Sequence, residues 1–196
     1  MTTIILALAS LLAAAPLVAK EKAPAVYQIP LPPKQDFTAV DWLVGEWAGK
    51  TTDRKAQGEI RLSVSYELDN QVILLRGEAS FQATKTSPAT KESWLGVLTS
   101  DRGAGGFLLR TFSSTGFITQ YRVTVEGPET YINPEGGEQP PPGWLFRTVI
   151  KRIDPEEIVE TVQAAPPNKA FFDYYTAKLS RVAAEEKTKT SPIPPQ

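Results

Sequence analysis

Apolar and polar residues alternate along most of the chain, in short segments separated by turn residues. In the clearest segment, residues 59–68, one face carries apolar or aromatic side chains and the other carries charged and hydroxyl groups. The apolar face consists of Ile60, Leu62, Val64 and Tyr66. A repeat of two residues is typical of a strand with one buried face. We therefore predict a half-buried strand here, followed by a tight turn at Asp69-Asn70.

Segments with the same alternation follow at the spacing of successive hairpins. They cover residues 71–81, 92–99, 106–113, 117–126, 129–133, 144–153, 156–164 and 170–182. With a first strand that starts at Gly45, this pattern gives nine or ten strands and almost no helix. The predicted fold class is all-β, an antiparallel up-and-down β-barrel, which removes exposed strand edges by closing on itself. A β-sandwich is the structural alternative.

A short helix is predicted immediately before the barrel, from Asp36 to about Leu43. Asp36 is a favourable helix cap, and Phe37, Val40 and Trp42 supply an apolar side. The barrel domain then covers residues 36–182. It follows a Pro-rich linker at residues 20–35 and precedes a charged, Pro-rich tail at residues 183–196, which we expect to be disordered.

The N-terminal segment predicts export. Residues 4–19 form an apolar run without charge that ends in the small residue Ala19, and the run is shorter than the ~20 residues that span a bilayer. These are features of a signal peptide over residues 1–19. No Lys or Arg precedes the run, so an N-terminal anchor that stays uncleaved is the alternative. After cleavage we expect no integral membrane span and a periplasmic or secreted protein.

Composition narrows the possible chemistry. The chain has 196 residues, a net charge of −1, no His and no Cys. These absences exclude Ser-His-Asp and Cys-His catalysis, disulfides and the usual zinc sites. The small net charge argues against nucleic acid as a partner. We therefore expect no metal and no cofactor, and carboxylates, Lys and Tyr are left as acid–base groups.

Residues 36–182 resemble the calycin-like barrels, which include lipocalins and nitrobindin-like barrels. Three features carry the resemblance: the short helix leading into Gly45-Glu46-Trp47, the order of strands joined by short hairpins, and a last strand that ends Leu179-Ser180-Arg181. The opening Trp-Leu-x-Gly-x-Trp-x-Gly is similar to that of small bacterial exported barrels. The resemblance implies a barrel that is either filled by side chains or holds one small ligand.

The resemblance also implies how one end of the barrel closes. In such barrels the tryptophan of the Gly-x-Trp motif packs across the closed end, beneath a basic side chain from the last strand. Gly45 and Trp47 occupy the motif positions here, and Arg181 is the favoured cation, with Lys178 on the opposite strand face as the alternative. The contact would be stabilised by cation–π attraction and by hydrogen bonds from the guanidinium to nearby carbonyls.

One property of the resembled barrels does not carry over. Nitrobindin-like barrels bind haem through a His on a late strand, and this chain contains no His. We therefore expect a barrel without His-ligated haem.

Three candidate ligand contacts are uncharged. Tyr66 lies on the first inner face described above, and Thr119 and Tyr121 lie on a second one within residues 117–126. A buried phenol needs a hydrogen-bond partner. Each tyrosine therefore either orients the polar head of a ligand or bonds a neighbouring backbone carbonyl.

Two further candidates are charged. Arg110 lies between Leu108 and Phe112 on its strand, where it either binds a carboxylate ligand or points to solvent with its stem over apolar surface. Glu160 alternates with Ile158 and Val162. It is either an interior base with a raised pKa or the partner of a cation such as Arg147.

Three functions are compatible with these sequence features. We favour a binding protein that holds a small apolar or amphipathic molecule, because the inner faces are aromatic and catalytic candidates are few. An envelope-associated structural protein without a ligand is the second hypothesis. The third is an enzyme of the cyclase, isomerase or hydrolase type that uses Tyr and carboxylate groups. The sequence indicates neither the ligand nor the oligomeric state.

Overall fold

The computed structural model describes residues 31–52, 57–85, 88–137 and 141–183. The predicted signal peptide, residues 20–30 of the predicted linker and residues 184–196 of the predicted tail lie outside the described residues. The barrel belongs to a unit that begins at Pro33.

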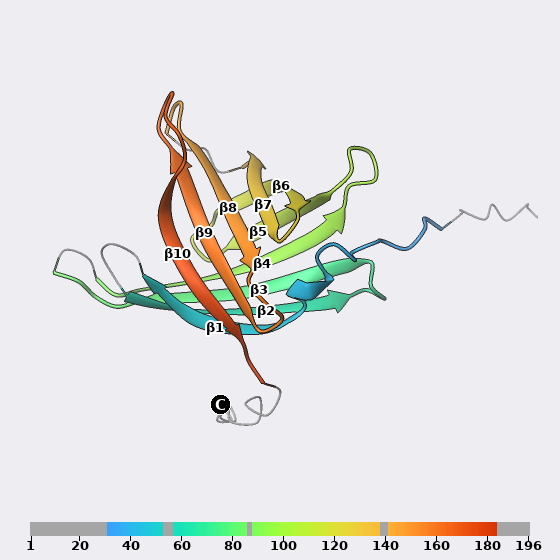
Figure 1. The fold of residues 1–196 in the computed structure, drawn as a ribbon, viewed down its shortest axis with the longest axis horizontal. Coiled ribbons are helices and arrows are strands. Elements are labelled where there is room, and N and C mark those ends of the chain that lie inside the picture. The colour runs from blue at the N-terminus through green and yellow to red at the C-terminus, as the bar shows by residue number, and fades with distance from the viewer. Residues whose placement is uncertain (1–30, 53–56, 86–87, 138–140, 184–196) are drawn as a thin grey trace, which may run out of the picture. The chain divides into compact units, whose positions relative to one another are not determined.

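Ten antiparallel strands form a closed barrel (Figure 1). Each strand pairs with its neighbours in the chain, and the first pairs with the last. The strands are β1 (Gly45–Thr52), β2 (Gln57–Glu67), β3 (Val72–Phe81), β4 (Thr90–Ser100), β5 (Phe107–Ser113), β6 (Ile118–Glu126), β7 (Glu129–Gly136), β8 (Leu145–Arg152), β9 (Glu157–Ala165) and β10 (Phe172–Arg181). The predicted all-β, up-and-down barrel is confirmed, and the sandwich alternative is wrong.

The turn between β2 and β3 shows why the strands end where they do. Leu68, Asp69 and Asn70 all have positive φ, at 52°, 56° and 61°. Asp and Asn tolerate this left-handed conformation better than most residues because their short side chains bond locally. The chain reverses here, at the predicted turn.

The segment before β1 differs from the prediction. A helix over residues 36–43 is wrong, because the structure has only a single 3-10 turn, η1 (Asp41–Leu43). The Asp36 carboxylate accepts hydrogen bonds from the backbone N–H and the hydroxyl of Thr38, at 3.0 and 2.7 Å, which forms a local turn instead of a helix cap.

The spacing of the buried residues explains this shorter turn. Phe37, Val40 and Leu43 are all buried, and their spacing of three residues is that of a 3-10 helix. The backbone bonds from Val40 to Phe37, at 2.8 Å, and from Leu43 to Val40, at 3.0 Å, follow the same period. Val44 is extended, so the chain passes directly into β1.

The antiparallel order gives the barrel two ends with different connections. The β2–β3, β4–β5, β6–β7 and β8–β9 turns lie at the end where η1 enters β1, which we call the η1 end. The remaining connections lie at the opposite end, which we call the cavity end because a cavity extends to it. Within the described part of the chain, no helix has the length and apolar character needed to cross a membrane.

Candidate functional site

The η1 end is filled by protein side chains. Phe37, Val40 and Leu43 pack with the inner faces of the strands in one hydrophobic core, and the Phe37 ring stacks on Phe107 with 5.9 Å between centroids. Trp47 is 1% exposed. Its indole N–H donates to the Leu43 carbonyl at 2.8 Å, so its one polar group is paired within the protein.

Arg181 covers Trp47 from the last strand. Its guanidinium carbon lies 4.2 Å from the centre of the Trp47 ring. The same group donates to the carbonyls of Val44, Trp42 and Pro155, at 2.8, 3.0 and 3.0 Å. The guanidinium therefore joins the segment before β1 to the β8–β9 turn. Lys178, the alternative cation, is exposed and forms an ion pair with Glu157.

Gly45 provides the space for this guanidinium. A Cβ atom at this position would lie 2.2 Å from Nη1 of Arg181, and the backbone φ of +141° disfavours other residues. The Gly-x-Trp motif thus has a local physical basis: the glycine admits the guanidinium and the tryptophan supplies the ring beneath it.

Tyr66 also lies at the η1 end. Its hydroxyl donates to Oδ1 of Asp41 at 2.8 Å, and its ring packs against Phe37 with 5.9 Å between centroids. Burial, followed by the contact with Asp41, raises the pKa of Tyr66 to about 12. The phenol bonds a carboxylate, where the sequence suggested a ligand or a backbone carbonyl, and it does not line the cavity.

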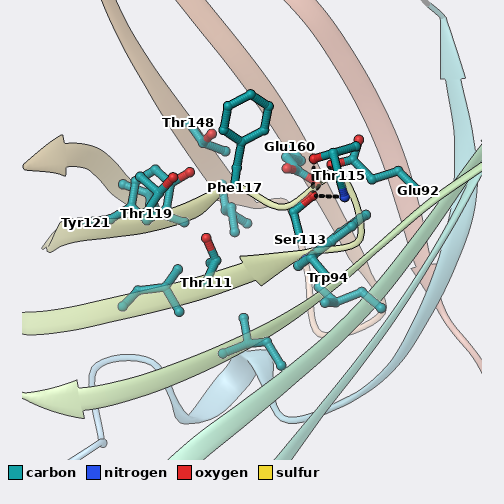
Figure 2. A pocket seen from close by; sticks show the side chains of 15 residues that line it. Glu92, Trp94, Thr111, Ser113, Thr115, Phe117, Thr119, Tyr121, Thr148 and Glu160 are labelled. Carbon is teal, nitrogen blue, oxygen red and sulfur yellow. Dashed lines mark hydrogen bonds between the residues drawn. The ribbon is translucent and has the colours of Figure 1, made fainter. Parts of the chain in front are cut away.

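A cavity of about 410 Å³ occupies the barrel from its middle to the cavity end (Figure 2). Its apolar wall is contributed by inner faces of strands around the barrel: Leu62, Leu75, Trp94, Leu109, Phe117, Tyr121, Ile132 and Ile150. Its polar wall consists of hydroxyls and two carboxylates: Thr111, Ser113, Thr115, Thr119, Thr148, Glu92 and Glu160. No Lys or Arg is among the described residues that line it.

Glu160 lies at the middle of β9, opposite Ala177 of β10 and Ile150 of β8. Burial alone raises its pKa to about 7, because removal from water disfavours the charged form. Its side chain is deep in the barrel but keeps contact with the cavity. The predicted partner Arg147 lies elsewhere: it bonds Gln163 and packs on the rings of Tyr131 and Phe171.

Glu92 differs from Glu160 because it is held by a hydroxyl network at the cavity end. The Ser113 hydroxyl donates to Oε1 of Glu92 at 2.9 Å, and Ser113 also shares a hydrogen bond with the hydroxyl of Thr115. Figure 2 shows these three side chains together beside the β5–β6 turn. The network ties that turn to β4 and fixes one carboxylate at the rim of the cavity.

Thr119 and Tyr121 come from the same strand, β6, and both line the cavity, as expected from the alternation of that strand. Figure 2 shows them on the same side of the cavity, across from Glu160. Thr119 is fully buried. Together these residues add two hydroxyl groups from β6 to the cavity wall.

Trp94 of β4 also lines the cavity. It pairs with Gly77 of β3 in the register of the sheet. A Cβ atom at Gly77 would lie 2.0 Å from the indole ring, so the glycine lets the ring lie flat against the neighbouring strand. A strand glycine opposite an aromatic residue is the signal that points to this arrangement.

Arg110 does not belong to the site. It is exposed on the outer face of β5 and donates to the side-chain oxygen of Gln120 at 2.8 Å. The candidate ligand contact at Arg110 is therefore corrected: of its two alternatives, the structure has the one in which the side chain points away from the cavity, because the inward positions of this strand are Leu109 and Thr111. Of the five candidate contacts, the structure brings Thr119, Tyr121 and Glu160 together at the cavity and leaves Tyr66 and Arg110 outside it.

The geometry restricts the chemistry of the cavity. Glu160 titrates near neutral pH, so it can accept or donate a proton or pair with a cation. Of the two phenols suggested as acid–base groups beside Glu160, Tyr66 is held at the other end by Asp41, whereas Tyr121 lines the same cavity. Among the described residues, no group of three carboxylates converges in a manner that would hold a metal ion.

No protein-family model matches the chain, and no curated protein matches it in sequence. Among solved structures, the chain is similar to one described as the crystal structure of Rv2717c from M. tuberculosis. The two share 18% sequence identity over 74% of this chain and 96% of that chain, with a TM-score of 0.49. The sequence identity and the TM-score are both low.

Proposed function

We propose that this protein is a calycin-like container that holds one small amphipathic molecule in the barrel cavity. The observation that carries the proposal is the contrast between a filled η1 end and a cavity of about 410 Å³ at the other end. Small-molecule sites are concave, mostly apolar, and of ~300–1,000 Å³. The Gly45, Trp47 and Arg181 arrangement supports the calycin-like assignment.

The lining favours a ligand with an apolar body and a polar group. Leucine, isoleucine and aromatic side chains surround most of the cavity, while hydroxyls and carboxylates are placed at particular points on its wall. Burial of an apolar ligand body would supply affinity, and the polar groups would set its orientation.

A fluorescence titration with N-phenyl-1-naphthylamine tests the proposal, because this uncharged dye brightens in apolar surroundings. We expect saturable binding of one dye per barrel. Thr111→Phe places a ring in the cavity and should abolish the signal, since Thr111 lines the cavity wall. Thr124→Phe is the matched control: Thr124 neighbours the inward Val123 on β6 and lies outside the cavity lining. Absence of saturable binding, or equal binding by both variants, would contradict the proposal.

We also propose that the protein is exported, on the strength of the apolar residues 4–19. The full-length sequence should be expressed in a bacterial host and the intact mass of the protein in the periplasmic extract measured. Loss of residues 1–19 is the expected result. A full-length protein retained with the membranes would favour the uncleaved anchor.

A further inference from the structure

The charges of the barrel are distributed unequally between its two faces. The described residues that line the cavity include two carboxylates, Glu92 and Glu160, and neither Lys nor Arg. Arg110 and Lys178 lie on the outer face instead, with partners there. A ligand inside the cavity would therefore meet negative charge and no balancing protein cation from its wall.

Glu160 has no hydrogen-bond or ion-pair partner among the described residues, and burial is the cause of its altered pKa. The side-chain oxygens of Glu160 are not fully buried either. Among the described residues, the fully buried side-chain oxygen without a hydrogen-bond partner is Oγ1 of Thr130, not an oxygen of Glu160. The Glu160 carboxylate therefore faces the cavity. A partner for this group has to reach it through the cavity.

The two carboxylates differ in their readiness to bind a ligand. Glu92 already accepts a hydrogen bond from Ser113 at the rim, whereas Glu160 lies deeper, at the middle of β9, between Ile150 and Ala177 of the neighbouring strands. The Coulomb attraction between two opposite charges is stronger, and less screened by salt, away from bulk water. Glu160 is thus the better anchor for a charged ligand.

The surroundings of the carboxylates also suit an organic cation. The indole of Trp94 and the ring of Phe117 line the same cavity, and aromatic faces attract ammonium groups. Leu62, Leu75 and Ile132 supply apolar surface for a hydrocarbon body. Among the described residues, no three His, Cys, Asp or Glu side chains converge to hold a metal ion instead.

We propose that the cavity selects a small organic cation, an alkyl or aralkyl ammonium, with Glu160 as its anchoring carboxylate. The inference rests on the proposed function, because it names the class of ligand for the same cavity. The ammonium donates to the Glu160 carboxylate, the hydrocarbon body lies against the leucine and isoleucine wall, and Glu92 contributes negative potential at the entrance.

Affinity for a cation at this site should depend on pH. Burial raises the pKa of Glu160 to about 7, so the carboxyl is ionised above neutral pH and mostly protonated at pH 6. The other titratable side chains that face the interior nearby are Glu92 of β4, Tyr121 of β6 and Tyr175 of β10; β8 contributes Thr148 and Ile150, which do not titrate. Affinity for a permanently protonated amine should therefore rise between pH 6 and pH 8.

Competition for bound N-phenyl-1-naphthylamine tests the inference. Octylamine, 1-octanol and octanoate have the same chain length and differ in the charge of the head. At pH 8 we expect octylamine to displace the dye at a concentration at least about tenfold lower than 1-octanol, with octanoate the weakest, because charge-assisted hydrogen bonds are stronger than neutral ones. Glu160→Gln should reduce the preference to about twofold and remove its pH dependence.

The outcomes separate this inference from the proposed function. If the wild-type protein does not bind the dye, the container proposal fails. If the dye binds and 1-octanol or octanoate displaces it at the same concentration as octylamine, the container proposal is supported and the cation inference is overturned. The inference is also overturned if the preference survives in Glu160→Gln and is lost in Glu92→Gln. Glu59→Gln, at an exposed position on β2, is the control and should keep the wild-type preference.

Discussion

The two ends of the barrel each contain a tryptophan, and the surroundings of these two residues differ. Trp47 at the η1 end is 1% exposed, bonded to the Leu43 carbonyl and covered by Arg181. Trp94 at the cavity end lies against Gly77 and is partly exposed to an internal space.

The polar groups at the two ends of the barrel differ in the same way. At the η1 end the guanidinium, the indole and the phenol all bond protein atoms. At the cavity end the Glu160 carboxylate has no such partner in the described part of the chain. Packing and satisfied polar groups stabilise the fold at the η1 end, while the cavity end leaves a charged group available to a ligand.

The largest effect should come from removing the η1-end ring. Trp47→Ala is expected to lower the free energy of unfolding by about 3–5 kcal/mol, as for other large-to-small core substitutions. Trp94→Ala should cost about 1–2 kcal/mol, because part of that ring already faces the cavity. Urea unfolding followed by circular dichroism measures both, and Trp47→Phe replaces Trp47→Ala if the latter does not fold. Equal costs at the two sites would remove the distinction between the ends.

Replacing the Glu160 carboxyl should give the next largest change in the free energy of unfolding. The sign of this change follows from the raised pKa of Glu160. Glu160 has a pKa of about 7 in the folded protein, above its ordinary value of 4.5. Its contribution to stability is thus present at low pH and lost as the pH rises through 7. Relative to the wild type, Glu160→Gln should gain up to about 3 kcal/mol between pH 5 and pH 8.

Urea midpoints across that pH range measure this gain, with Glu59→Gln as the reference for replacing an exposed carboxyl. Parallel curves for the wild type and Glu160→Gln would show that Glu160 is solvated like a surface group, and the cavity end would then hold no special carboxylate.

A smaller loss of stability is expected at Gly77, the residue against which the Trp94 ring packs. In Gly77→Ala the new methyl group would lie 2.0 Å from the indole, so the ring has to move into the cavity. We expect a cost of about 1–2 kcal/mol, typical of overpacking, together with weaker dye binding. Gly136→Ala is the matched control, because a Cβ atom there meets nothing within 4 Å. A wild-type dye affinity in Gly77→Ala would place Trp94 outside the ligand site.

Much of the architecture could be predicted from the sequence because each strand carries its own alternation. The ten strands and the turn at Asp69-Asn70 follow from local pattern and turn chemistry. The helix predicted before β1 is too long, because the pattern of Phe37, Val40 and Trp42 suggests an amphipathic helix, whereas Leu43 is the third buried residue and completes the three-residue spacing of a 3-10 turn.

Less of the candidate site than of the fold could be predicted from the sequence. In β5 both faces carry apolar residues, with Leu109 inside and Phe112 40% exposed outside, so alternation alone could not decide where Arg110 points. The inward position of Glu160 was indicated by its neighbours Ile158 and Val162. Two features could not be predicted, because they depend on strand register and on the residues across the cavity. One is that no Lys or Arg among the described residues lines the cavity near Glu160, and the other is the contact between Trp94 and Gly77.

The most direct test follows the indole resonances of the four tryptophans in a ¹⁵N–¹H NMR spectrum, assigned with Trp47→Phe and Trp94→Phe, while octylamine is added at pH 8. We expect the Trp94 resonance to shift saturably and the Trp47 resonance to stay in place. A stationary Trp94 resonance, or a shift confined to Trp47, would contradict a ligand cavity at this end of the barrel.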